Sequence, residues 1–192
     1  WILHFLYHIA EGGTAGFVMA TGELSNGETA RLKVRSKLVE MGYVDCIVQL
    51  SGQLFANTQI PCSLWFLSKN RGGSKGFRKR EDEVLFIDAR NLGSLIPGSR
   101  RQKALSEEEL ERIAAVYRDF RKEKSPGEQP GFAAVANIEQ IREYDYALSP
   151  GRYVGAEVSD EEGEPFEELF PKLVDQLEEQ MDKWTRARSF PI

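Results

Sequence analysis

The chain has 192 residues, of which 41% are hydrophobic and 29% are charged, enough apolar material for one folded domain with an appendage. Its 25 lysines and arginines and its 30 aspartates and glutamates give a net charge of −5, which excludes a uniformly basic nucleic-acid coat. Two cysteines exclude a disulfide scaffold, and no apolar run approaches the ~20 residues of a membrane helix. We therefore expect a cytoplasmic protein with no membrane contact.

The chain begins with an apolar segment in which Trp1, Phe5 and His8 recur at helical spacing. No capping residue precedes it, which predicts the remainder of a longer helix and hence a C-terminal part of a larger polypeptide. His4 and His8 have the i, i+4 spacing of two zinc ligands, but no third ligand suggests itself. We interpret them as partly buried helix histidines and predict no metal site.

The next segments predict part of an α/β sheet. Residues 15–20 and 44–50 have the pattern of buried strands, and residues 28–41 form an amphipathic helix whose basic residues, Arg35 included, face water. That connection is long enough for a parallel crossover. The strand at 60–68 follows a short polar loop, so it should lie antiparallel beside 44–50. The fold class is therefore α/β, the second half of a mixed doubly wound sheet.

The rest of the chain predicts a basic loop and further helices. Residues 69–80 hold six basic residues and three glycines without an acid, the composition of a mobile loop. A strand follows at 83–89. Ser106 and Glu109 form a capping box that opens a helix through Lys122, and a short helix is expected at 138–141.

The C-terminal segment is acidic and then helical. After the acidic run 157–164, Pro165 opens a last helix with one apolar face, formed by Phe166, Leu169, Phe170, Leu173, Leu177, Met181 and Trp184. We divide the chain into residues 1–90, half of the α/β domain, residues 91–156, a helical and irregular extension, and residues 157–192, an acidic C-terminal helix.

The segment 50–61, LSGQLFANTQIP, is the most informative part of the sequence. It lies at the carboxyl end of a predicted buried strand, where open α/β sheets place their ligands. It combines a glycine, an aromatic residue in a polar setting and several amides. On composition alone, a hydrophobic plug over the end of the sheet, formed by Leu54 and Phe55, is slightly favoured over a ligand contact.

This segment and its neighbours resemble the modification (methyltransferase) subunit of type I restriction-modification systems. The resemblance rests on VDCIVQLSGQLFANTQIPCSLWFLSKN, GTAGFVMATGELSNG, ARLKVRSKLVEMG, DEVLFIDARNLG and YALSPGRYVG, and it runs from Trp1 to about Gly155. It implies adenine-N6 DNA methylation with S-adenosylmethionine as the methyl donor. The family's cofactor glycine loop and its catalytic Asn-Pro-Pro-Phe tetrapeptide do not occur in this sequence. The resemblance therefore implies that this chain holds no catalytic residue and no cofactor site, and that it is inactive alone.

The resemblance also implies roles for particular residues. Phe55 matches an aromatic residue that stacks on the flipped target adenine in similar enzymes. Asn57 and Thr58 are then candidates for contacts with the base edge or a nearby phosphate. Arg78, Lys79 and Arg80 of the basic loop are candidates for DNA phosphate contacts, with a solvated face as the equal alternative.

The partners that the resemblance implies are DNA, a specificity subunit, a second methyltransferase subunit and a restriction subunit. The acidic C-terminal helix would help to dock the specificity subunit. A different interpretation is a non-enzymatic interaction module, in which this helix binds a partner protein and the half-sheet serves as a scaffold.

Overall fold

The computed structural model describes residues 1–192 except 75, 123–128, 156–169, 179 and 182–192. The chain forms two compact units, Trp1–Glu157 and Val158–Ile192. The larger unit holds a central sheet, and in the smaller one residues 170–178 are helical. Within the described part of the chain, every helix is too short or too polar to cross a membrane.

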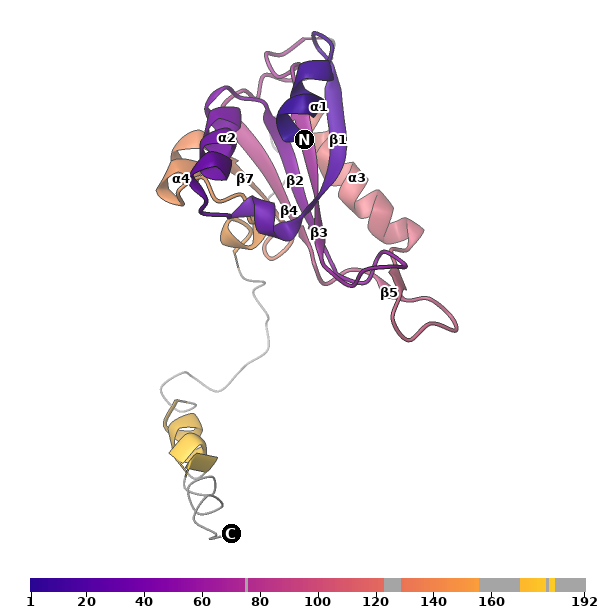
Figure 1. Ribbon diagram of the computed structural model, residues 1–192, viewed down its shortest axis with the longest axis vertical. Helices are drawn as coiled ribbons and strands as arrows, with labels where there is room; N and C mark the ends of the chain where they lie inside the picture. The colour runs from indigo at the N-terminus through magenta and orange to yellow at the C-terminus, as the bar shows by residue number, and fades with distance from the viewer. Residues whose placement is uncertain (75, 123–128, 156–169, 179, 182–192) are drawn as a thin grey trace. The chain divides into compact units, whose positions relative to one another are not determined.

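The sheet of the larger unit has five strands in the order β1-β3-β2-β4-β7 (Figure 1). These strands are β1 (Thr14–Ala20), β2 (Val44–Leu50), β3 (Cys62–Ser68), β4 (Glu83–Ala89) and β7 (Ala133–Asn137). β3 pairs antiparallel with both β1 and β2, β2 pairs parallel with β4, and β4 pairs antiparallel with β7. The expected mixed α/β sheet is confirmed, as is the antiparallel pairing of the second and third strands. β1 and β2 run in the same direction, and β3 lies between them.

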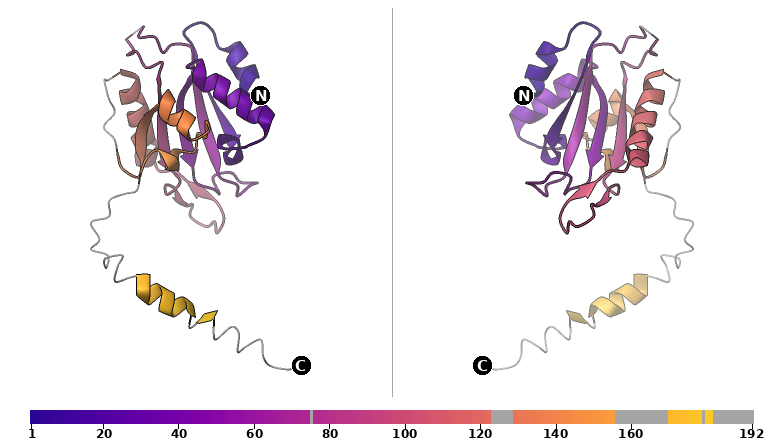
Figure 2. Two further views of the ribbon diagram at one scale, coloured as in Figure 1. Left: turned by 90° about the vertical axis from the view of Figure 1, so that its left-hand side faces the viewer. Right: turned by 90° about the vertical axis from the view of Figure 1, so that its right-hand side faces the viewer.

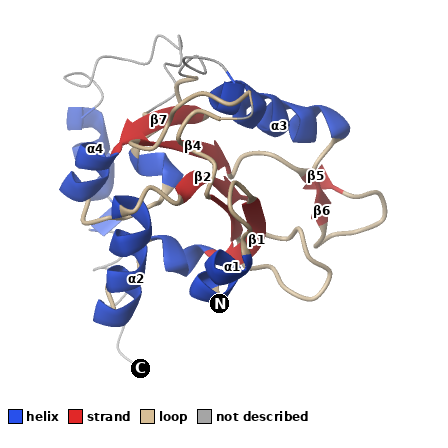
Figure 3. Cartoon of the chain, turned by 90° about the horizontal axis from the view of Figure 1, so that it is seen from above, coloured by secondary structure: helices blue, strands red, loops and turns tan. Residues whose placement is uncertain are grey.

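Helices cover both faces of this sheet, which the view from above shows directly (Figure 3). One face carries α1 (Ile2–His8), α2 (Thr29–Glu40) and α4 (Ile138–Glu143), and the other carries α3 (Glu107–Lys122). Neighbouring residues of β4 alternate between the two cores: Phe86 belongs to the first, and Leu85 and Ile87 belong to the second. Because both faces are covered, the central strands are apolar on both sides, as the sequence pattern indicated.

Four short elements complete the unit. Two 3-10 turns, η1 (Thr21–Leu24) and η2 (Pro150–Arg152), follow β1 and α4 along the chain. A two-stranded hairpin is formed by β5 (Ser94–Leu95) and β6 (Lys103–Ala104).

The predicted starts of the helix after Ser106 and of the helix at residue 138 are confirmed, and the start of the last helix at Pro165 lies outside the described residues. The Ser106 hydroxyl accepts a hydrogen bond from the backbone N–H of Glu109 at 3.2 Å, and the Glu109 carboxylate accepts one from the Ser106 N–H at 2.8 Å. α4 begins with a second capping box, between Asn137 and Gln140, that the sequence analysis did not identify. Both α3 and β7 come from the segment 91–156, and β7 joins the same sheet as β4.

Two expectations about side-chain exposure were wrong. Arg35 is only 4% exposed, and its Nε donates to the carbonyl of Tyr146 at 2.6 Å. It was assigned to the solvent face because it follows other basic residues in α2, but loops from both sides of the helix surround it. His4 and His8 are exposed rather than partly buried, and the His8 ring lies 2.9 Å from the His4 carbonyl. Among the described residues, no group of three or more acidic, histidine or cysteine side chains could hold a metal.

A buried ion cluster around Asp45 anchors the basic loop 69–80. Asp45 of β2 is fully buried, and Arg80 donates to both of its carboxylate oxygens at 2.8 and 3.1 Å. Arg71 lies 3.2 Å from the same carboxylate, and the Tyr117 hydroxyl donates to it at 2.8 Å. Composition predicted a mobile loop here, yet these contacts hold the loop against β2 and α3.

Asp45→Ala is expected to lower the free energy of unfolding of this chain by about 3–5 kcal/mol, because two arginines then lose their buried counter-charge. Tyr117→Phe, which removes one hydrogen bond, should cost about 1 kcal/mol. Urea unfolding followed by circular dichroism measures both changes. Lys79→Gln is the matched control, since the Lys79 side chain is 70% exposed in the same loop. A loss below 1 kcal/mol for Asp45→Ala would contradict this account of the cluster.

Candidate functional site

Three strands of the sheet end at one edge, which we call the carboxyl edge. Leu50 pairs with Ala89 at the ends of β2 and β4, and Ala20 at the end of β1 pairs with Cys62, where β3 begins. The opposite edge, the amino edge, contains the start of β1 and the end of β3. Ligands of open α/β sheets bind outside the carboxyl ends of their strands. The loop 51–61 between β2 and β3 lies at this edge and is therefore the candidate site.

The loop 51–61 folds back on itself as a narrow hairpin. Phe55 bridges to Thr58, which leaves Ala56 and Asn57 at the turn. The backbone N–H of Gln53 donates to the carbonyl of Gln59 at 3.3 Å, so the two arms of the loop are joined below the turn.

Glycine is required where the loop begins. A Cβ atom on Gly52 would lie 2.5 Å from the carbonyl oxygen of Gln59, closer than real Cβ contacts. The next residue, Gln53, has φ +67°, in the left-handed region. This close approach of the two arms depends on the absence of a side chain at Gly52.

Contacts at its base fix the loop to the rest of the unit. The Thr21 hydroxyl donates to the carbonyl of Pro61 at 2.6 Å, and the backbone N–H of Lys103 donates to the carbonyl of Gln53 at 2.8 Å. Leu54 packs against the core cluster on the α3 face of the sheet. The loop is thus held by η1, directly after β1, on one side and by the β5–β6 hairpin on the other.

The side chains near the turn are exposed. Phe55 is 43% exposed, Asn57 is exposed and Thr58 is half-buried. Leu54 alone fits the hydrophobic plug that composition favoured, since Phe55 keeps much of its ring in solvent. Ile60, on the returning arm, is 64% exposed and was not singled out from the sequence. The structure therefore brings the three predicted residues Phe55, Asn57 and Thr58 together at the tip of one anchored loop.

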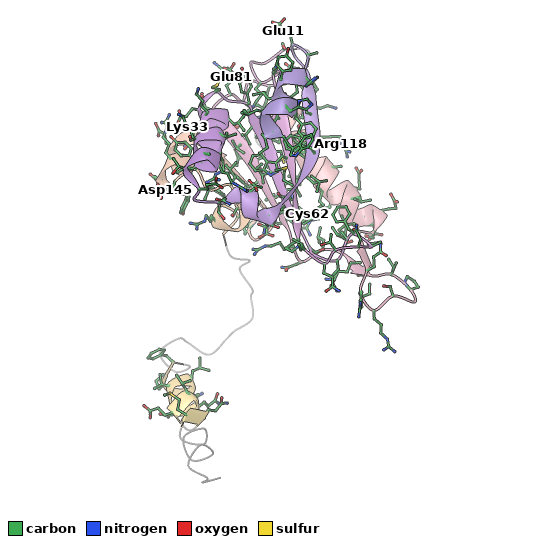
Figure 4. All side chains as sticks on the ribbon, viewed as in Figure 1. Glu11, Lys33, Cys62, Glu81, Arg118 and Asp145 are labelled. Carbon is green, nitrogen blue, oxygen red and sulfur yellow. The ribbon has the colours of Figure 1, made fainter. Side chains whose placement is uncertain are left out.

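The basic loop 69–80 lies at the amino edge, away from Phe55. It follows Ser68, whose partner in the sheet is Thr14, the first residue of β1. A strand of seven residues spans roughly 20 Å, and this length separates the two loops. Figure 4 shows the two edges: Glu81, next to the basic loop, lies near the top of the view, and Cys62 lies well below it.

The basic residues of this loop differ in how exposed and how well paired their charges are. Arg80 is 1% exposed and paired with Asp45, so the expected phosphate contact of Arg80 is wrong. The Arg78 side chain is 13% exposed and donates to Glu83 at 2.6 Å and to the carbonyl of Phe120 at 2.7 Å. Lys79 is exposed but lies 3.5 Å from Glu81. Ion pairs with nearby carboxylates therefore neutralise the positive charge that was expected to bind DNA phosphates.

The carboxyl edge carries no activated nucleophile among the groups that titrate there. Burial raises the pKa of the Cys62 thiol, so it stays protonated at neutral pH. Both carboxylate oxygens of Asp88, near the end of β4, accept hydrogen bonds from Arg90, at 2.8 Å for Nε and 2.6 Å for Nη2. The arrangement of exposed aromatic and amide groups is suited to binding a planar ligand rather than to bond making.

Comparison with known proteins gives the relatives of this chain. Residues 1–162 match the family described as N-6 DNA methylase. The type I restriction enzyme MjaIX methylase subunit of Methanocaldococcus jannaschii is 40% identical over 192 residues, which cover 98% of this chain and 33% of that protein. The HindI methylase subunit of Haemophilus influenzae is 33% identical over 183 residues, covering 95% of this chain and 39% of that one. The chain thus spans about a third of the length of these relatives.

Solved structures show the same fold. A type I restriction-modification methyltransferase subunit from Streptococcus thermophilus superposes with a TM-score of 0.66 at 30% identity, covering 80% of this chain and 29% of that one. The M protein of the type I restriction enzyme EcoKI superposes with a TM-score of 0.59 over 99% of this chain and 44% of its own. At 18% identity, the second likeness concerns the fold alone.

The anchored geometry of the loop predicts different effects for its two adjacent apolar residues. Phe55→Ala should lower the melting temperature only slightly, because the side chain is 43% exposed and belongs to neither core cluster. Leu54→Ala should cost about 1–2 kcal/mol, because it removes apolar contacts with the core cluster. Thermal unfolding of the two variants side by side makes the comparison. A larger loss for Phe55→Ala than for Leu54→Ala would show that Phe55 is the plug.

Proposed function

This chain belongs to the N-6 DNA methylase family, and from that premise we propose that it forms the target-base side of a type I restriction-modification DNA methyltransferase. The reaction is methyl transfer from S-adenosylmethionine to N6 of adenine in DNA. The observation that carries the proposal is the exposed ring of Phe55 at the tip of a loop anchored on both sides at the carboxyl edge.

The role proposed for Phe55 follows from how a base inside a duplex becomes accessible. Enzymes that modify such a base rotate it out of the stack and hold it against aromatic or apolar side chains. Phe55 is 43% exposed and fixed in position by the loop beneath it, so its ring offers a face for stacking without a change of the core. Stacking of a base on an aromatic side chain is worth ~1–3 kcal/mol.

Asn57 and Thr58 are proposed to contact the edge of the base or a neighbouring phosphate. The exposed amide of Asn57 offers both a donor and an acceptor, as the Watson–Crick edge of adenine requires. The Thr58 hydroxyl oxygen accepts a hydrogen bond from the Ile60 N–H at 3.2 Å, and its own proton remains to be donated. Both residues lie within three positions of Phe55, on the same turn.

The family uses S-adenosylmethionine, and the described residues at the carboxyl edge do not fit its site. Both oxygens of Asp88 accept charge-assisted hydrogen bonds from Arg90, so ribose hydroxyls would have to compete with this ion pair for the carboxylate. The space beside Gly52, the glycine after β2, is already occupied by the carbonyl group of Gln59. We therefore assign the cofactor site and the Asn-Pro-Pro-Phe tetrapeptide to sequence outside these 192 residues. We assign no chemical step of the reaction to a side chain of this chain.

The proposed partners are DNA, a specificity subunit, a second methyltransferase subunit and a restriction subunit. Leu173 and Leu177, one helical turn apart in residues 170–178, are 52% and 59% exposed, which supports docking of this helix to the specificity subunit. Phe166, Leu169 and Trp184 of the expected apolar face lie outside the described residues. A non-enzymatic module would use the same helix, but it gives the exposed Phe55 no role. The cytoplasmic location stays a prediction.

Phe55→Ala is expected to lower kcat/KM for adenine methylation in the assembled enzyme, meaning this sequence within its complete subunit together with the specificity subunit. Loss of one stacked base corresponds to roughly a 5- to 150-fold decrease. Fluorescence of 2-aminopurine at the target position measures base capture in the same variant. Phe55→Trp should keep much of the activity, and Ile60→Ala serves as the control for an exposed apolar residue of the same loop. Full activity with unchanged fluorescence in Phe55→Ala would contradict the stacking role.

A cofactor test applies to the 192-residue chain itself. Calorimetric titration with S-adenosylmethionine is expected to give no binding heat, because the residues at the carboxyl edge do not form the site. A one-to-one isotherm in the micromolar range would overturn the assignment of the cofactor site to other sequence.

A further inference from the structure

A second basic segment lies at the carboxyl edge, beside the loop 51–61. Residues 94–104 form a hairpin in which Ser94 pairs with Ala104 and Leu95 pairs with Lys103. We call it the 94–104 hairpin. It projects from the sheet next to the label β5 in Figure 1, and in both views of Figure 2 its rose-coloured loop extends below the ends of the strands.

The charge of this segment is entirely positive and largely unpaired. Residues 89–105 contain four basic residues and no acid. One of the four, Arg90, pairs with Asp88. The other three are Arg100, Arg101 and Lys103, and no ion pair joins them to a carboxylate among the residues that the structure describes.

Other exposed arginines in the described part of the chain have a partner of some kind. Arg112 lies over the Phe132 ring and Arg152 over the Tyr144 ring. Arg31, Arg118 and Arg142 each pair with a glutamate. Arg100 and Arg101 instead are exposed side by side, in a chain whose net charge is −5. Adjacent like charges without a counter-ion repel each other, so a phosphate group at this place would be favourable.

The hairpin and the loop 51–61 are joined into one rigid edge. The backbone N–H of Lys103 donates to the carbonyl of Gln53 at 2.8 Å. The Glu109 carboxylate, which caps α3, also accepts a hydrogen bond from the Gly93 N–H at 2.9 Å. The base of the hairpin is thus hydrogen-bonded to α3 on one side and to the Phe55 loop on the other, so the hairpin begins and ends beside that loop.

We propose that the 94–104 hairpin is a DNA-backbone contact, in which Arg100, Arg101 and Lys103 bind phosphates that flank the target nucleotide. The inference rests on the proposed function of the Phe55 loop and adds to it. A base that leaves the stack rotates about its own backbone, so the neighbouring phosphates must be held while the base moves. Fixed positive charges next to the stacking residue hold them.

This assignment differs from the one that the family resemblance implied for residues 78–80. Arg78 and Arg80 are neutralised by Glu83 and Asp45, and they lie at the amino edge. The hairpin has fewer basic residues, but those residues are unpaired and lie at the edge where the target base is bound.

The test compares two triple variants of the assembled enzyme that remove the same charge. The first is Arg100→Gln, Arg101→Gln and Lys103→Gln. The control is Lys33→Gln, Lys37→Gln and Lys122→Gln, whose lysines are exposed on α2 and at the end of α3. Fluorescence anisotropy with a duplex that contains the recognition sequence gives the affinity over a range of salt concentrations. Each lost phosphate contact should reduce the log–log salt slope by about 0.9.

The hairpin variant is expected to reduce the slope by roughly 2–3 and to weaken binding to all sequences alike, while the control changes it by less than about 0.5. Equal slopes in the two variants would overturn the proposal. So would loss of a subunit from the hairpin variant in gel filtration, which would assign the hairpin to a protein interface. Failure of the proposed function is a separate result: the unaltered enzyme then shows no 2-aminopurine signal that depends on Phe55, whatever the slopes are.

Discussion

The direction of β3 places the two loops 51–61 and 69–80 at opposite edges of the sheet. β3 enters the sheet between β1 and β2 and runs antiparallel to both. The connection before it, residues 51–61, must then lie at the carboxyl edge, and the connection after it, residues 69–80, must lie at the amino edge. One strand reversal therefore separates the exposed aromatic residue from the longest basic segment of the chain.

The two edges use charge in opposite ways. At the amino edge, the buried Asp45 pairs with Arg71 and Arg80, and the partly exposed Glu83 pairs with Arg78, so these ion pairs fix the basic loop to the folded unit. At the carboxyl edge, backbone hydrogen bonds and Leu54 fix the loops, and the side chains of Phe55 and Arg100 stay in solvent. The buried ion pairs lie at the amino edge of the sheet, and the exposed groups that can bind a ligand lie at the carboxyl edge.

Local patterns in the sequence predict most of the elements, because each pattern depends on neighbours in the chain. The apolar runs of β2 and β3 and the capping box of α3 belong to this class. The position of Phe55 also follows, since it needs only the order of strand, loop and strand. The exposure of Phe55 could not be predicted in this way, because composition cannot show that Leu54 occupies the core position.

The errors arose where a long-range partner decides the outcome. Arg80 was assigned to the surface because its neighbours are basic, yet its partner Asp45 lies 35 positions earlier, inside an apolar strand. Arg35 is buried by the carbonyl of Tyr146, 111 positions away. The 94–104 hairpin was not predicted because its segment has no periodic pattern, although its basic residues at 100–103 and the absence of acids from 89 to 105 are visible in the sequence.

Photochemical crosslinking tests most directly whether the Phe55 loop holds the target base. A duplex with 5-iodouracil at the target position is irradiated in the assembled enzyme, and the crosslinked peptide is identified by mass spectrometry. Our account predicts a crosslink at Phe55, within the peptide that spans the loop 51–61. A crosslink in residues 69–80, or one that persists in Phe55→Ala at the same yield and position, would contradict it.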